Sequence, residues 1–475
     1  MTQIKSLTAA ELLRLYRRRE LSPVEVTRDQ LDRIETFQPA INAFIIVDRD
    51  GALAAAKASE ARWQKGEPIG LADGLGATVK DNVWLKGFSS RRGSLTSDPS
   101  PMKDDAPAVA RLRESGAVIL GKTTLPEFGW IGVCHSPLTG ITRNPWKLDR
   151  TPGGSSGGAA AAALLNLGHL HIGTDGAGSI RIPAAFTGVF GIKPSFGRVA
   201  AYPASPFSIL AHVGPLTRTV SDAALMLSVI GGPDMRDMAA WNTPTPDYRV
   251  GLDGGVRGLR VAWSPRLGYV QKLDPQIEAA TKKAAQAFGD LGAIVEEADP
   301  GFAEPYEMIM TLWGAVSAMI VAAAPDSDRK KMDPGFLKLA EEGTRYSLAD
   351  YLAAFTARQD LALVMERFHQ KYDLLLTPQM PLGAIEAGHV TPPDGSYGER
   401  WIAWSPYTYP FNLTQQPAAS VPCGFSSDGL PIGLQIVGPA RQDLLVLRAA
   451  RAFESARPFK FIEVPRQTDP ANRHS

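Results

Sequence analysis

The chain has 475 residues but only two cysteines, Cys134 and Cys423. One disulfide is arithmetically possible, yet so sparse a supply of thiols is typical of a reducing compartment. Neither sign of charge prevails, because 50 basic residues stand against 49 acidic ones. Without a net positive charge or a local block of Lys and Arg, we expect no nucleic-acid partner and no membrane partner.

Long apolar runs are also absent. The longest, 159–165 and 318–324, fall far short of the roughly 20 residues that span a bilayer. The segment 1–10 lacks the apolar stretch of a secretory signal. These absences predict a cytoplasmic protein. Apolar residues nevertheless make up 44% of the chain, which is enough for an ordinary packed core.

The sequence pattern predicts helices at the N-terminus and an α/β core after them. Residues 1–65 contain two capping boxes, Thr8–Glu11 and Ser22–Glu25, each ahead of an amphipathic run. Over 74–230, short apolar runs alternate with glycine-rich turns and helical segments, which indicates strands with helical crossovers.

A mostly helical excursion is predicted at 233–367, where Pro/Asp-rich joints precede long helical patterns. Strand-like and helical patterns return at 372–460. We interpret the excursion as a variable insertion rather than an independent domain. Residues 1–475 are therefore expected to form one domain of the α/β class.

Two motifs suggest other functions but lack the structural context that those functions need. Gly116–Thr123 matches the phosphate loop of nucleotide-binding proteins, but 117–120 is typical of a buried strand, and a helix precedes it. Gly153–Gly157 matches the G-x-S-x-G elbow of Ser-His-Asp hydrolases, but a proline-broken loop precedes it. The histidines available to this alternative, centred on Ser155, are His169, His171, His212, His369, His389 and His474.

Metal and thiol chemistry have weaker candidates. His169 and His171 have a spacing that suits two ligands on one strand, but no carboxylate or cysteine ligand set lies near them. Cys134 and His135 combine a thiol with a base, although adjacent side chains seldom face each other. We therefore predict no metal site and no cofactor.

Three segments carry a more specific pattern. Lys80 lies among apolar residues, and burial can lower the pKa of a lysine enough to make it a base. Thr151–Gly158 surrounds Ser155 and Ser156 with four glycines just before an alanine-rich helix, which suggests a tightly packed site. Gly173–Arg181 contains several small residues whose N–H groups can converge as an oxyanion hole. Taken singly, a solvated lysine, a flexible linker and a phosphate-binding turn are the alternatives.

Together with further segments, these residues resemble the amidase signature family of serine hydrolases. The matching segments extend along nearly the whole chain, at 142–146, 150–158, 188–198, 214–218, 372–378 and 429–438. The resemblance implies a single large mixed β-sheet flanked by helices on both faces, with 233–367 as its least constrained part. It also implies cleavage of a carbonyl–nitrogen bond without a cofactor.

The resemblance assigns roles to individual residues. Ser179 is the implied nucleophile, Ser155 the bridging serine after a cis Gly154–Ser155 peptide, and Lys80 the buried base. The implied oxyanion donors are the backbone N–H groups of Gly176, Ala177, Gly178 and Ser179. Residues expected to support these groups are Ser156, Thr174, Asp175 and Arg181.

Two positions depart from the family pattern. Ala177 replaces a glycine, and we expect its methyl group to narrow the hole or shift one donor. Gln415 also stands where glycine is common, and it either reaches the pocket or fills a loop. Gly129, Trp130 and Ile131 are the other predicted pocket residues, because the corresponding segment lines the pocket in relatives.

The substrate implied by these aromatic candidates, with Trp401, Trp404 and Tyr407, is a small apolar or aryl amide, carbamate or ester. A second function compatible with the resemblance is the amidase subunit of a tRNA-dependent amidotransferase, which does not act alone. The balanced charge favours the self-sufficient hydrolase. The sequence carries no prediction of oligomeric state.

Overall fold

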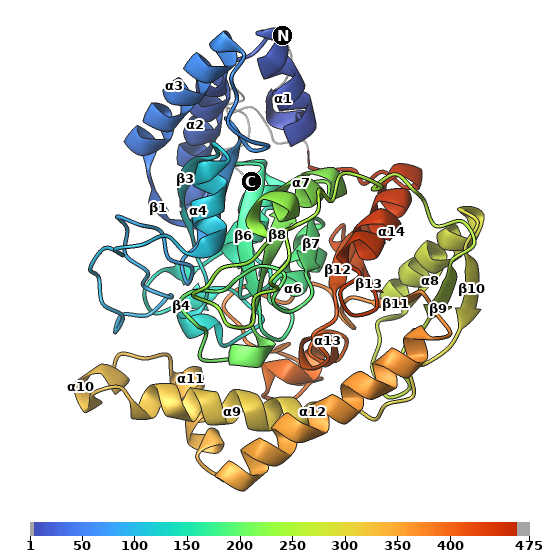
Figure 1. Cartoon of the computed structure of the whole chain (residues 1–475). Coiled ribbons are helices and arrows are strands. Elements are labelled where there is room, and N and C mark those ends of the chain that lie inside the picture. Colours follow the sequence, from blue (N-terminus) through green and yellow to red (C-terminus); the bar gives the residue numbers. More distant parts are fainter. Residues whose placement is uncertain (1–3, 463–475) are drawn as a thin grey trace.

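A computed structural model describes residues 4–462, and within them eleven strands form one mixed sheet (Figure 1). Their order across the sheet is β1-β3-β2-β6-β8-β7-β12-β13-β11-β9-β10. The strands are β1 (Phe44–Val47), β2 (Gly76–Lys80), β3 (Val118–Thr123), β6 (Leu170–Asp175), β7 (Phe190–Lys193), β8 (His212–Thr217), β9 (Arg260–Trp263), β10 (Ile294–Glu297), β11 (Leu374–Pro378), β12 (Ala418–Phe425) and β13 (Pro431–Val437). β4 (His135–Ser136) and β5 (Gly140–Ile141) form a separate hairpin.

Parallel strands occur in two groups. β3, β2 and β6 run parallel to one another, as do β11, β9 and β10. All pairs between β6 and β11 are antiparallel, and so is the edge pair of β1 with β3. The predicted single mixed sheet is therefore confirmed.

Helices cover both faces of this sheet, as predicted. Along β3, Ile119 packs into a cluster with α1, α4 and α7, whereas Val118 and Leu120 pack into another with α2 and α3. The alternation follows from the two-residue period of a strand. The helices of this half are α1 (Ala9–Arg18), α2 (Pro23–Ile41), α3 (Arg49–Lys65), α4 (Pro107–Glu114), α5 (Gly157–Leu164), α6 (Arg181–Thr187) and α7 (Val220–Ile230).

Both predicted capping boxes form. Thr8 and Ser22 accept the N–H groups of Glu11 and Glu25, whose carboxylates accept the N–H groups of the two cap residues. Each box satisfies two backbone donors that the first helical turn leaves unpaired. The short pattern S/T-x-x-E therefore places the starts of α1 and α2 correctly.

The excursion is mostly helical, but it also adds two strands that the sequence pattern did not reveal. β9 lies between β11 and β10, so the segment extends the sheet to its edge. Each strand has only four residues, too few for an alternating pattern to be distinct. The helices of this part are α8 (Pro275–Asp290), α9 (Tyr306–Ala322), α10 (Asp326–Arg329), α11 (Pro334–Gly343) and α12 (Leu348–His369), followed later by α13 (Pro410–Leu413) and α14 (Asp443–Ala456).

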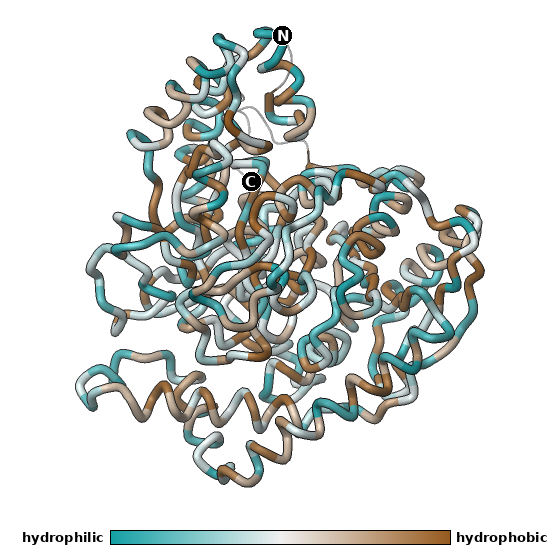
Figure 2. The backbone as a smooth tube through the Cα atoms, in the orientation of Figure 1, coloured by the Kyte–Doolittle hydropathy of each residue, from teal (hydrophilic) through white to brown (hydrophobic). Residues whose placement is uncertain are grey.

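Helices α9 and α12 are amphipathic rather than apolar throughout. Figure 2 shows hydrophobic and hydrophilic residues alternating along both. The buried face of α9 includes Ile309, Leu312, Trp313 and Val316. Within residues 4–462, no helix is long and apolar enough to cross a bilayer.

Candidate active site

Four predicted catalytic and supporting residues converge at one edge of the sheet. Lys80 ends β2 and Asp175 ends the neighbouring β6, and because these strands are parallel, their carboxyl ends meet. Ser155 lies in the loop before α5, and Ser179 in the loop between β6 and α6. This is the edge at which parallel α/β sheets bind ligands.

Ser155 and Ser179 line the same pocket, which has a volume of about 150 Å³. The Gly154–Ser155 peptide is cis, as predicted. Gly129 also lines the pocket, and its φ is +74°. A Cβ at position 129 would lie 3.2 Å from the Ser155 hydroxyl oxygen, so glycine suits both the backbone and the space.

Lys80 is fully buried and lies among hydroxyl groups. Its Nζ is 2.7 Å from Ser155 Oγ, 2.9 Å from Ser156 Oγ and 2.9 Å from Thr174 Oγ1. Within residues 4–462, no carboxylate forms an ion pair with this amine. Burial consequently lowers the pKa of Lys80 from 10.5 to about 7.

The hydrogen bonds around Lys80 suit an uncharged amine. Ser156 Oγ donates its one hydrogen to the Thr174 carbonyl at 3.1 Å, so it accepts from Lys80. Thr174 Oγ1 accepts from Asn82 Nδ2 at 3.0 Å and has room for a second donor. A neutral amine can give its two hydrogens to Ser156 and Thr174 and direct its lone pair at Ser155.

Lys122 is equally buried but has a different environment. Its Nζ lies 2.8 Å from Asp81 Oδ1 and donates to the Ser89 carbonyl at 2.6 Å. Burial lowers the pKa of Lys122, and the charge of Asp81 opposes that effect. Because Lys122 lies within β3, the sequence Gly116–Thr123 is not a phosphate loop.

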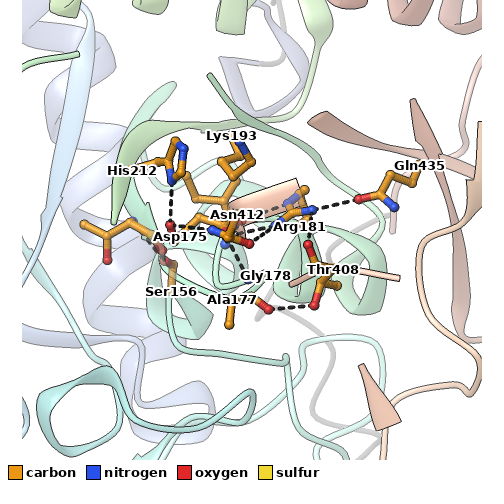
Figure 3. Close-up of polar contacts among 12 residues, drawn as sticks. Ser156, Asp175, Ala177, Gly178, Arg181, Lys193, His212, Thr408, Asn412 and Gln435 are labelled. Atoms are coloured by element: carbon orange, nitrogen blue, oxygen red, sulfur yellow. Dashed lines mark hydrogen bonds and ion pairs between the residues drawn. The ribbon is translucent and has the colours of Figure 1, made fainter. Parts of the chain in front are cut away.

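The loop that carries Ser179 is held by a buried ion pair. Arg181 Nε and Nη2 each donate to the Asp175 carboxylate at 3.0 Å. Burial alone raises the pKa of Asp175, but the Arg181 charge outweighs it and the net pKa is lowered. Figure 3 shows Arg181 also reaching the carbonyl of Thr408 and the side chains of Asn412 and Gln435.

One predicted oxyanion donor is wrong. The N–H of Gly178 donates to Asp175 Oδ1 at 2.7 Å, so it is engaged within the loop (Figure 3). Among residues 4–462, the N–H groups of Gly176, Ala177 and Ser179 have no such partner. These three groups are the donors that remain for an oxyanion.

Ala177 does not narrow the pocket as expected. Its side chain is buried in an apolar cluster with Ile182 and Phe186, while its carbonyl accepts the Thr408 hydroxyl at 2.6 Å. The pocket wall includes Gly176 and Ser179 but not Ala177. By contrast, Gly178 has a φ of +123°, and a Cβ there would lie 2.7 Å from Thr408.

The predicted substrate-pocket residues are mostly elsewhere. Only Gly129 lines the pocket; Ile131 is buried in the core, and Trp130 lines a separate cavity. Gln415 fills a loop, because its side chain donates to the Ile209 carbonyl at 2.9 Å. Residues three or more positions from a motif can point in any direction, which explains these corrections.

The pocket walls come largely from segments without a motif. The loop at 200–211 supplies Tyr202 and Phe207, and α9 supplies Trp313 and Ile320. Asn82, two residues after Lys80, is also exposed to the pocket. Its position beside Lys80 was the one signal that the sequence offered for it.

Histidine and cysteine chemistry find no support at this site. Among residues 4–462, no histidine hydrogen-bonds to Ser155 or Ser179. His169 and His171 instead contact Gln30 and Thr78, and burial lowers their pKa values to about 4 and about 3. His474 lies outside the described residues.

Cys134 and Cys423 are free, and burial raises the pKa of both thiols. Cys134 is therefore no thiolate nucleophile. Within the part of the chain that the structure describes, no three His, Cys, Asp or Glu side chains cluster as a metal site would require.

Comparison with known proteins gives consistent matches over nearly the full length. A family model described as Amidase matches residues 25–447. The chain is 36% identical over 462 residues to an acylamidase from Rhodococcus erythropolis, covering 95% of this chain and 96% of that protein. It is 35% identical over 492 residues to the amidase-type subunit of a glutamyl-tRNA(Gln) amidotransferase from Myxococcus xanthus, with coverages of 96% and 98%.

Solved structures agree. A bacterial aryl acylamidase of the amidase signature family has a TM-score of 0.88 and 31% identity, covering 96% of this chain and 97% of that chain. A 6-aminohexanoate cyclic dimer hydrolase with bound substrate has a TM-score of 0.86 and 29% identity, with coverages of 95% and 97%.

Proposed function

Because the chain belongs to the amidase signature family, whose members cleave carbon–nitrogen bonds, we propose that Ser179 is its nucleophile and that Ser155 and Lys80 relay the proton. The observation that carries this proposal is the environment of Lys80. A fully buried amine with hydroxyl partners, and with a pKa lowered to about 7, is in large part uncharged near neutral pH.

The first half of the reaction makes an acyl-enzyme. A serine hydroxyl is a weak nucleophile until a base takes its proton. Lys80 accepts the proton of Ser155, which accepts that of Ser179 as Ser179 Oγ attacks the carbonyl carbon. The negative charge on the carbonyl oxygen is bound by the N–H groups of Gly176, Ala177 and Ser179.

Collapse of this intermediate releases the amine. Ser155 gives a proton to the departing nitrogen, which is needed because an unprotonated amide nitrogen is a very poor leaving group. Water then attacks the acyl group on Ser179 by the same relay and releases the acid. The cycle consumes one water and returns Lys80 to its neutral state.

We further propose that the substrate is an apolar or aryl amide, with carbamates and esters as related possibilities. The pocket supports this choice through Val83, Phe128, Phe207, Trp313 and Ile320. The relatives named acylamidase and aryl acylamidase agree with it. A cytoplasmic location is proposed from the two free thiols.

A serine-directed fluorophosphonate is expected to add one label to the chain and to be found on Ser179. The relay raises the nucleophilicity of that hydroxyl alone, so Ser179→Ala should abolish labelling. Intact-protein mass spectrometry measures the label, and peptide mapping locates it. Ser205→Ala is the matched control, because Ser205 lines the same pocket outside the relay. Full labelling of Ser179→Ala would refute the proposal.

The second candidate is an amidotransferase subunit that requires partners, as the name of the relative from Myxococcus xanthus suggests. Rates with the isolated chain separate the two functions. We expect turnover of an anilide and negligible release of ammonia from glutamine. Glutamine hydrolysis that appears only with added partner subunits, with no anilide turnover, would favour the amidotransferase function instead.

A further inference from the structure

A second cavity lies directly behind one wall of the catalytic pocket. Its volume is about 270 Å³, compared with about 150 Å³ for the pocket that holds Ser155 and Ser179. It is bordered by α9, α11 and the 3-10 helix η4 (Trp401–Trp404). Its apolar walls are Trp130, Met310, Leu339, Val390, Trp401 and Ile402.

Trp313 of α9 is the wall between the two spaces, because it lines both. On the catalytic side, its ring lies against the oxyanion loop: a Cβ built on Gly176 would be 3.0 Å from the Trp313 ring carbon Cζ3. Removal of this indole would therefore open the pocket beside the reacting carbonyl, not at a distant edge.

The indole is held in place on several sides. It stacks on Phe207 with ring centroids 3.9 Å apart and an interplanar angle of 21°. Its Nε1 donates to the Trp130 carbonyl at 3.2 Å, and Trp401 packs edge-on at 6.1 Å. A buried ring with a hydrogen bond and an aromatic partner has little freedom to swing aside.

The charges at the rim of the second cavity are already paired. Lys338 Nζ lies 2.6 Å from Glu399, and Arg400 Nη2 lies 2.9 Å from Glu342. All four residues border the cavity. Since each charge has an opposite partner, the space suits an uncharged apolar group rather than an ion.

We propose that Trp313 sets the upper size of the substrate group bound beside Ser179, by closing off the second apolar cavity. A substrate with a long alkyl or biaryl group is excluded by the indole and would extend into the second cavity if the indole were absent. This inference rests on the proposed hydrolase function, and it assigns a specificity-determining role to Trp313.

The test uses two series of 4-nitroanilide and N-aryl acetamide substrates, the first lengthened in the acyl group and the second in the amine. In Trp313→Ala, the ratio of kcat/KM for the longest to the shortest member should rise at least about tenfold over the wild type in one series. Trp313→Phe, which keeps an aromatic ring, should give an intermediate ratio. It also serves if the alanine variant does not fold.

A plug variant separates a cavity effect from a general loosening. Leu339 lines the second cavity but not the catalytic pocket. Adding Leu339→Trp to Trp313→Ala should return the ratio to the wild-type value without lowering the rate for the shortest substrate. An unchanged ratio in both series, or a gain that survives the plug, would overturn the proposal. If the wild type hydrolyses no member and takes no fluorophosphonate label, the proposed function fails instead.

Discussion

Replacing Lys80 by methionine is expected to lower kcat by at least about 10³-fold. Methionine fills a similar volume but cannot accept a proton from Ser155, whose oxygen lies 2.7 Å from the amine. The hydroxyl of Ser179 would then attack without a base. Initial rates on a reactive anilide measure the loss, and circular dichroism shows whether the variant is folded.

The same amine predicts the sign of the pH dependence of the wild type. Because burial lowers the pKa of Lys80 to about 7, the amine carries a proton below that pH and cannot take one from Ser155. The rate should thus rise with pH through a single ionisation near pH 7 and level off in the alkaline range. A flat profile, or one that falls over this range, contradicts the assignment of Lys80 as the base.

Lys122→Met provides the matched control. Lys122 is also fully buried and lies on β3, the neighbour of β2, but its partner is Asp81. Its loss leaves a buried carboxylate without a counter-charge, which costs about 3–5 kcal/mol of unfolding free energy. We expect a lower Tm and nearly unchanged kcat for the folded fraction. Equal losses of kcat in both variants would mean that Lys80 acts through the fold.

The features that the sequence predicted well are those written in a few consecutive residues. The capping boxes at Thr8 and Ser22 act over four positions, and the apolar run that became β3 is continuous. Lys80, Ser155 and Ser179 were found for the same reason, since each lies in a short glycine-rich or apolar segment at the end of a strand or the start of a helix.

The features that the sequence did not predict depend on contacts between distant segments. Phe207 and Trp313 are 106 positions apart in the numbering, yet they stack on each other at the pocket wall. The loss of the Gly178 donor has the same origin in three dimensions, because only the folded loop brings its N–H to Asp175. Composition and spacing carry no record of such an approach.

Arg181→Met is expected to have the largest effect on stability among the variants of the site. It leaves the carboxylate of Asp175 buried without its counter-charge, which costs about 3–5 kcal/mol. Thr408, Asn412 and Gln435 lose a donor as well. Chemical denaturation measures the change in unfolding free energy. Arg49→Met tests an ion pair of similar length, 2.7 Å to Asp32, on the surface, and should leave Tm almost unchanged.

The catalytic effect of Arg181→Met should exceed what instability alone explains. Asp175 accepts the N–H groups of Gly178 and Ile180, and these bonds fix the backbone on both sides of Ser179. Without Arg181, the pKa of Asp175 rises, and a protonated carboxyl group accepts these bonds less strongly. We expect kcat of the folded variant to fall about 10²-fold, comparable to the loss of one oxyanion donor. Arg181→Lys keeps the charge but not the two-pronged contact, and it should recover stability more fully than rate. If lysine restored both equally, the ion pair would support the fold alone, and the geometry of the loop would have to be held by Thr408 and Asn412.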